Sequence, residues 1–211
     1  MAELRIVDAA ERADLANFVG RAVRLSSSSI VRLRAGAEGT VGVWASTRFD
    51  VIVARSVRGS LHPTDTTVRA RELLTALAVL QTDVVHPGQA IDAEWRSALP
   101  PGTGFVHVDD VPAAVVTELV DQGVAVAQEH PGPTGGPSSE LLDQRVLTVR
   151  GGGQDVAVPL RCLFALSGMG FVGEGQDEPV RVRVTRGWLR LDARYGSVLR
   201  RRHPQLPLLL S

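Results

Sequence analysis

Two helix-like segments that enclose three strand-like runs limit what the first part of this chain can fold into. The helix-like segments repeat apolar residues every three to four positions, as a helix with one buried face does. The runs between them are rich in β-branched and aromatic residues and are separated by short turns. Helices can then cover one face of an antiparallel sheet, which is an α+β arrangement. The helices are predicted at residues 8–24 and 66–81, and the strands at residues 30–34, 40–46 and 49–55.

The rest of the chain repeats this mixture of helices and strands. Prolines interrupt residues 82–110, where only a short helix at 91–99 and a short strand at 104–108 are expected. Asp110 fits the N-cap of a long helix that ends near Glu129. Beyond that helix, a hairpin is predicted at residues 145–158, a helix at 159–167 and a second hairpin at 179–194.

These elements predict an α+β fold in which antiparallel β-meander and hairpin elements are packed by helices, in two similar-sized halves. The predicted organisation is a helix–β-meander–helix unit at residues 1–81, a connecting segment at 82–110, a unit of one helix plus two β-hairpins at 111–199, and an Arg/Pro tail at 200–211. Matches at a constant offset of 115 residues leave an internal duplication open. They relate Val31, Gly36, Val41 and Val43 to Val146, Gly151, Val156 and Val158.

The charges cancel over the whole chain but are unevenly distributed along it. All 23 basic residues are arginine. Residues 82–143 hold one arginine and ten acidic residues, a net charge of −9, whereas residues 181–211 hold eight arginines and one acidic residue, a net charge of +7. Segments of opposite sign attract each other. We therefore expect the basic C-terminal segment to cover the acidic middle segment, either within one chain or across a homodimer.

Alternation along the last predicted hairpin places its arginines together on one face. Successive side chains of a strand point to opposite faces, so the valines and leucines of this hairpin face a core and its arginines face away. Arginine side chains bind phosphates, and a tryptophan can stack on a base. The competing interpretation is a charged face that is only solvated, as in many antiparallel sheets. The candidate nucleic-acid-binding residues are Arg181, Arg183, Trp188, Arg190, Arg194, Arg200, Arg201 and Arg202.

The sequence contains no recognisable catalytic, metal-binding or cofactor-binding motif. His107 and Asp109 share one face of a predicted strand, but two ligands do not complete a zinc site. Residues 168–173 have the glycine spacing of a dinucleotide-binding loop, yet they follow a helix rather than a strand. Cys162 lies in an apolar run and is expected to be a buried, unreactive thiol. We therefore predict no catalytic residue, no metal and no cofactor.

The sequence also lacks a segment of membrane-spanning length and a secretory signal. Its single cysteine cannot form a disulfide within the chain, which fits a reducing compartment. We therefore expect a cytoplasmic protein without a membrane partner.

Three runs of the sequence resemble conserved uncharacterised proteins of high-GC Gram-positive bacteria. The runs are Trp95–Pro101, Met169–Phe171 and Gly187–Val198. The resemblance implies a bacterial protein and supplies no activity or site residues.

The leading hypothesis is a non-catalytic binding or regulatory protein that acts through protein–protein contacts or self-association, with a homodimer as the expected form. One alternative is nucleic-acid binding through the arginine-rich C-terminal hairpin. Another is a small-molecule enzyme with a cleft between the halves, for which His86, His107 and Asp109 are the first candidates. The sequence does not indicate which small molecule would bind.

Overall fold

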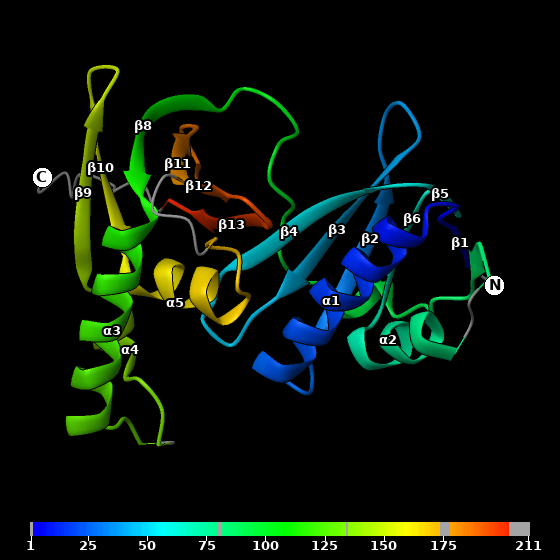
Figure 1. Cartoon of the computed structure of the whole chain (residues 1–211), viewed down its shortest axis with the longest axis horizontal. Coiled ribbons are helices and arrows are strands. Elements are labelled where there is room, and N and C mark those ends of the chain that lie inside the picture. Colours follow the sequence, from blue (N-terminus) through cyan, green and yellow to red (C-terminus); the bar gives the residue numbers. More distant parts are fainter. Residues whose placement is uncertain (1, 80–81, 134, 174–177, 203–211) are drawn as a thin grey trace, which may run out of the picture.

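An eight-stranded antiparallel sheet runs through the computed structural model, which describes residues 2–79, 82–133, 135–173 and 178–202 (Figure 1). Its strands are β2 (Ile30–Ala35), β3 (Thr40–Ser46), β4 (Ile52–Arg58), β6 (Asp65–Arg69), β8 (Val106–Pro112), β11 (Pro179–Val184), β12 (Trp188–Ala193) and β13 (Gly196–Arg201). The strand order is β6-β2-β3-β4-β13-β12-β11-β8, so the sheet passes from the first half of the chain into the second. The predicted α+β class with antiparallel sheets is confirmed.

Helices cover one face of this sheet (Figure 1). They are α1 (Ala9–Leu25), α2 (Ala70–Val79), α3 (Ala113–Glu129), α4 (Ser139–Asp143) and α5 (Leu160–Gly168). The 3-10 turn η1 (Asp92–Glu94) lies instead in the segment between the two halves. The carboxylate of Asp8 caps α1, because it accepts hydrogen bonds from the backbone N–H groups of Ala10 and Glu11. Helix α3 continues through Gly123, where an added Cβ would lie 2.8 Å from Leu160. This glycine therefore allows α3 to pack closely against α5.

Two smaller sheets flank the large one. Strands β1 (Glu3–Arg5), β5 (Ser60–His62) and β7 (Val84–Val85) form a three-stranded sheet in the order β5-β1-β7. Strands β9 (Arg145–Gly151) and β10 (Gln154–Pro159) form a separate hairpin. One hydrophobic core joins the helices, the inner face of the large sheet and parts of these smaller sheets.

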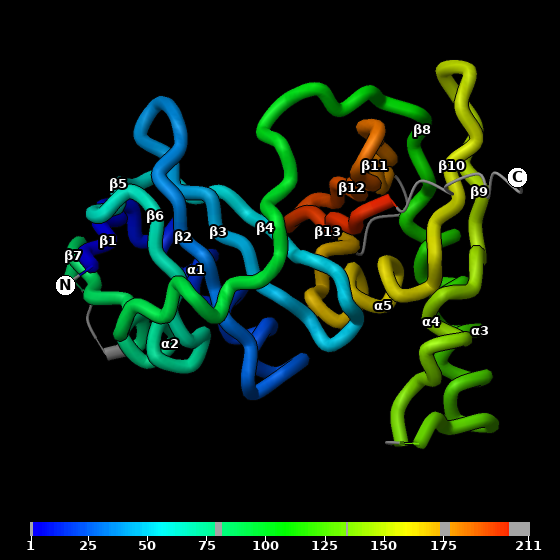
Figure 2. Tube along the Cα trace, turned by 180° about the vertical axis from the view of Figure 1, so that it is seen from behind, coloured from blue at the N-terminus to red at the C-terminus, as the bar shows by residue number. Residues whose placement is uncertain are grey.

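The segment between the two halves crosses the opposite face of the large sheet (Figure 2). We call residues 86–105 the connector. Its Trp95 packs with Trp188, Ile52 and Leu199 in a second hydrophobic cluster, and both tryptophans are only 8% exposed. The centre of the sheet is therefore covered on both faces, by helices on one side and by the connector on the other.

Strand β13 joins the halves, and the sequence analysis missed it. The prediction assigned residues 200–211 to a tail, whereas β13 extends to Arg201; residues 203–211 lie outside the described part of the chain. Within β13, Val198 packs in the helix-side core and Leu199 packs beneath the connector. Because both faces are covered, this strand lacks the alternation of apolar and polar residues that reveals a half-buried strand.

Other predicted boundaries are wrong as well. The strand expected at residues 49–55 begins only at Ile52 and continues to Arg58. Residues 66–69 pair with β2 as part of β6, because their β-branched side chains suit a strand, and helix α2 starts only at Ala70. The helix expected at residues 91–99 is reduced to the turn η1. Asp110 is not a helix cap, because β8 continues to Pro112 and α3 begins after it without a side-chain cap.

Arg161 holds the turn between β3 and β4 against α5, and so links the two halves. Its side chain is 7% exposed, and its Nη1 donates a hydrogen bond of 2.8 Å to the backbone carbonyl of Phe49. Its Nε and Nη2 donate to the two carboxylate oxygens of Asp143 at 3.1 and 2.8 Å. Arg200 of β13 donates to the same carboxylate at 2.8 Å. Since β4 and β13 pair over only three residues each, these contacts reinforce a narrow junction.

Replacing Arg161 with methionine, which removes the guanidinium group and keeps an apolar side chain, tests this link. Arg161→Met should lower the free energy of unfolding by about 2–3 kcal/mol, because the buried carbonyl of Phe49 loses its hydrogen-bond donor. Urea unfolding followed by circular dichroism measures the change. Arg145→Met, at an exposed position at the start of β9, is the matched control. Equal stability of the two variants would contradict the proposed role of Arg161.

The carboxyl group of Asp143 should make this junction sensitive to acid. Burial alone would raise its pKa, but hydrogen bonds and charge from Arg161 and Arg200 outweigh burial and hold the pKa below its ordinary value of 3.8. A carboxyl with a lowered pKa in the folded state stabilises the fold above its unfolded pKa, and this contribution is lost as the pH falls through the folded pKa. Between about pH 5 and pH 3, Asp143→Asn should therefore lose less stability than the parent protein. Asp121→Asn, on the exposed face of α3, should follow the parent, and an Asp143→Asn curve that also follows it would refute the argument.

Candidate functional site

The outer face of the second half of the sheet gathers three of the predicted arginines. Strand pairing sets Arg183 opposite Arg190, and Arg181 opposite both Asp192 and Asp110 on the neighbouring strands. The three arginines lie on the face that is turned away from the helices, since the intervening valines and leucines belong to the helix-side core. The structure thus confirms that the alternation places these arginines on one face.

Carboxylates lie within this row of arginines and offset much of its charge. Arg190 Nε donates to Asp192 at 2.6 Å, and Arg183 lies 3.5 Å from the same carboxylate. Arg181 Nε lies 3.3 Å from Asp110, which also bonds to His107 at 2.8 Å. The hydrogen bond from His107, followed by that from Arg181, lowers the pKa of Asp110 below its usual value. The arginine row is therefore already paired with anions of its own chain.

The other predicted nucleic-acid-binding residues do not extend this row into one continuous surface. Arg200 lies on the opposite side of the sheet, with Asp143. Trp188 is buried in the cluster with Trp95 and is covered by the guanidinium of Arg201, 5.7 Å from its ring centre, so its ring offers little surface for stacking. The remaining two pair locally: Arg194 with Glu178, and Arg202 with the carbonyl of Thr185. Nucleic-acid binding by these residues stays a prediction.

The acidic and basic segments of the sequence do meet within one chain. Asp110 and Asp143 come from the acidic segment at 82–143, and their partners Arg181 and Arg200 come from the basic segment that begins at residue 181. A similar pairing occurs in the first half, where Arg32 donates to both carboxylate oxygens of Asp65 at 2.8 Å. That hydrogen bond is the main cause of the lowered pKa of Asp65.

The candidate residues for an enzyme site are not brought together. His107 and Asp109 lie on β8, whereas the ring of His86 lies 3.3 Å from the backbone carbonyl of Ala2 in the other half. Among the described residues, no group of three or more His, Cys, Asp or Glu side chains could hold a metal ion. Cys162 is fully buried, as predicted, and burial raises the pKa of its thiol to about 12.

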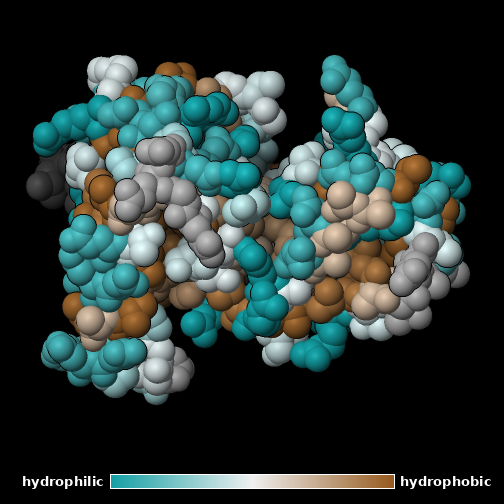
Figure 3. All heavy atoms as spheres, viewed as in Figure 1, coloured by the Kyte–Doolittle hydropathy of each residue, from teal (hydrophilic) through white to brown (hydrophobic). Residues whose placement is uncertain are grey.

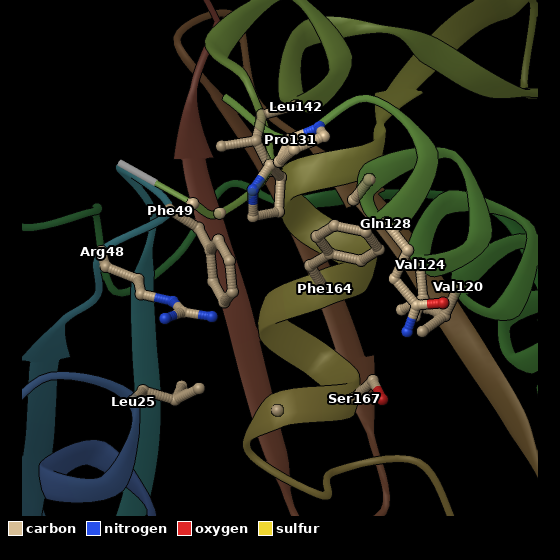
Figure 4. Close-up of a pocket in the computed structure, with 15 residues that line it drawn as sticks. Leu25, Arg48, Phe49, Val120, Val124, Gln128, Pro131, Leu142, Phe164 and Ser167 are labelled. Carbon is tan, nitrogen blue, oxygen red and sulfur yellow. The ribbon is translucent and has the colours of Figure 1, made fainter. Parts of the chain in front are cut away.

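A cavity of about 760 Å³ lies at the junction of the two halves, on the helix side (Figure 4). We call it the junction groove. Figure 3 shows the same face of the molecule, with apolar atoms over α3 and over α1 and α2. The lining includes the end of α1, the turn between β3 and β4, helices α3 and α5, and the loop before α4. Its residues are Leu25, Arg48, Phe49, Val120, Val124, Ala127, Gln128, Pro131, Gly135, Gly136, Pro137, Leu142, Phe164, Ser167 and Gly168.

Two aromatic rings meet across this junction. Phe49 of the first half and Phe164 of α5 pack edge to face, with ring centres 5.9 Å apart. The guanidinium of Arg48 lies 5.0 Å from the centre of the Phe49 ring. The sequence analysis named a cleft between the halves as an alternative, but none of its first candidates, His86, His107 and Asp109, lines this groove. The lining residues come from segments between positions 25 and 168 that share no motif or spacing.

Solved structures with a similar fold are bacterial sliding clamps. The chain matches the DnaN sliding clamp (DNA polymerase III subunit beta) from Bartonella birtlesii bound to griselimycin, with a TM-score of 0.59 and 15% identity over 97% of this chain and 67% of that one. It matches a putative DNA polymerase III beta subunit from Eubacterium rectale with a TM-score of 0.61 and 11% identity, over 97% of this chain and 66% of that one. The DNA polymerase sliding clamp from Bacillus subtilis matches with a TM-score of 0.58 and 14% identity, over 98% and 66%.

These similarities establish a clamp-type fold and no activity, because the identities are low. The chain spans about two thirds of the length of these clamp chains. No curated protein matches its sequence. Within the part of the chain that the structure describes, none of the helices has both the length and the apolarity to span a membrane.

Two family models divide the sequence between them, and both are described as domains of unknown function. The model DUF8010 matches residues 1–97, and the model DUF8185 matches residues 100–205. The two matches meet inside the connector, which separates the halves in the structure as well. Since the second match covers half of the chain, the protein belongs to the family of the domain of unknown function DUF8185.

Proposed function

We propose that this chain is a non-catalytic binding protein of the bacterial cytoplasm that acts through protein–protein contacts, beginning with its own self-association. The observation that carries the proposal is the clamp-type fold, which covers 97% of the chain in the match to the Bartonella clamp. The matched proteins are named sliding clamps and subunits of a polymerase, so they work as parts of assemblies. A fold that is built as one continuous sheet across two halves suits a rigid scaffold of this kind.

The β9–β10 hairpin supplies a surface for self-association. It is not hydrogen-bonded to either of the other sheets in the described part of the chain. Its two-residue turn has Gly152 at φ 57° and Gly153 at φ 74°, so the flanking pair of Gly151 and Gln154 is the first hydrogen-bonded pair. Bonded and non-bonded pairs alternate from there, which turns the N–H group of Thr148 toward the free edge. Unpaired strand edges readily add a strand from a second chain.

Self-association through this edge should depend little on salt. The long-range attraction between the acidic and basic segments is already satisfied within the chain by the Asp110–Arg181 and Asp143–Arg200 pairs. Strand pairing rests on backbone hydrogen bonds and apolar contact, which salt screens only weakly.

Light scattering coupled to size-exclusion chromatography tests this proposal directly. The parent protein should be a homodimer or larger at both low and high salt. Thr148→Pro removes the outward N–H group without removing a bond between β9 and β10, so it should shift the protein toward the monomer. Thr148→Val keeps this N–H group and should associate as the parent does. A monomeric parent protein would overturn the proposal. An oligomer that dissociates at high salt would overturn the edge-strand mechanism.

Nucleic-acid binding is the second candidate, favoured by the row of arginines on the outer sheet face and by the polymerase names of the matched structures. If it is correct, a labelled DNA duplex should bind at low salt, with an affinity that falls steeply as salt is added. Reversal of two charges in this row, by Arg183→Glu with Arg190→Glu, should abolish most of this binding. Arg71→Glu, on the exposed face of α2, is the control. Fluorescence anisotropy measures all three proteins, and an equal loss in the control variant would show that the binding is nonspecific.

A further inference from the structure

The junction groove has the size and lining of a ligand site. Its volume of about 760 Å³ lies within the range of small-molecule pockets, about 300–1,000 Å³. Most of the side chains that line it are apolar, and they come from both halves of the chain. No aspartate or glutamate is among the lining residues that the structure describes.

Arg48 is the one charged residue among the described residues of this lining. Many of the arginines elsewhere in the described structure are paired with carboxylates, whereas Arg48 has no ion pair with another described residue. Its guanidinium instead rests beside the ring of Phe49, at the edge of the groove. A cation beside an apolar cavity that lacks carboxylates complements an anion with an apolar body.

Two glycines bring the walls of the groove together. Gly123 allows α3 to approach α5, and an added Cβ at Gly168 would lie 2.7 Å from Leu25 at the end of α1. The first contact sets one wall of the groove, and the second draws the end of α5 toward the first half. An occupant would therefore touch α1 and Phe49 on one side and α3 and α5 on the other.

We propose that the junction groove binds an apolar carboxylate, a small molecule with an aliphatic or aromatic body and one carboxylate. The body lies between Phe49, Phe164 and the exposed side of α3, and the carboxylate is bound by the guanidinium of Arg48. This binding site goes beyond the self-association proposed above. Because the ligand contacts both halves, its binding should also stabilise the junction against heat.

Three probes with the same aliphatic chain separate the contributions of charge and apolar surface. They are decanoate, decan-1-ol and decyltrimethylammonium, each used below its micelle-forming concentration. Isothermal titration calorimetry should show one decanoate per chain, weaker binding of the alcohol and no binding of the ammonium. Decanoate should also raise the melting temperature. Failure of decanoate to bind, or equal binding of all three probes, would overturn the proposal.

Matched variants locate the site. Arg48→Gln should weaken decanoate binding about 10-fold, or about 1.4 kcal/mol, because the carboxylate loses its charged hydrogen-bond donor, while Arg71→Gln should leave the binding unchanged. Val124→Trp places a large ring in the groove from a position that is 41% exposed, and it should remove binding. Val126→Trp makes the same change at a position that is 42% exposed on the same helix but does not line the groove, and it should bind normally. Unchanged affinity in Arg48→Gln or Val124→Trp would refute the site.

Ligand binding in the junction groove can be tested separately from self-association. The Thr148→Pro variant carries its change on β9, outside the groove, so it should bind decanoate as the parent does whatever its oligomeric state. If instead a second copy covers the groove, decanoate should fail to bind the oligomer and bind the monomer, and that result would overturn the proposal for the assembled protein.

Discussion

The pairing of β4 with β13 joins the two halves of the large sheet within the described part of the chain. It spans only three residue pairs, so the backbone bonds alone make a narrow hinge line. Side chains on both faces of the sheet add contacts across this junction. On the helix side, Arg161 ties the turn before β4 to α5, and on the outer side the connector covers Ile52 and Leu199 of the two paired strands. The junction groove and the continuous sheet both depend on this alignment.

The sequence predicted the elements whose two faces differ in polarity. Helix α1 and the hairpin of β11 and β12 are half-buried, so their apolar residues recur with the period of the backbone and their class is confirmed. Strand β13 was not predicted, and residues 66–69 were assigned to a helix. A strand that is buried on both faces, or that is followed at once by a helix, shows no such period. A cleft between the halves was one alternative from the sequence, but the residues that line the junction groove could not be predicted, since only the tertiary structure brings Leu25, Phe49 and Phe164 together.

Part of the uneven distribution of charge along the sequence is satisfied within the fold. The acidic segment supplies Asp110 and Asp143, and the basic segment supplies arginines that reach them once β8, α4 and β13 are in place. Pairs of this kind contribute little to stability at an exposed surface, but they do disfavour alternative arrangements that would leave like charges together. The distribution of charge along a sequence can therefore indicate which segments become neighbours in the folded protein.

The placement of the tryptophans has an optical consequence. All three tryptophans of the chain belong to the outer-face cluster or pack against it, at Trp44, Trp95 and Trp188, and the helix-side core contains phenylalanines instead. Intrinsic fluorescence excited at the indole band is therefore a local signal for the connector and the sheet face beneath it. Far-ultraviolet dichroism reports the helices on the other side. If the connector detaches from the sheet before the helices unfold, the fluorescence emission should shift to longer wavelength while the helical dichroism signal persists. The two spectra therefore report separately on the opposite faces of one sheet.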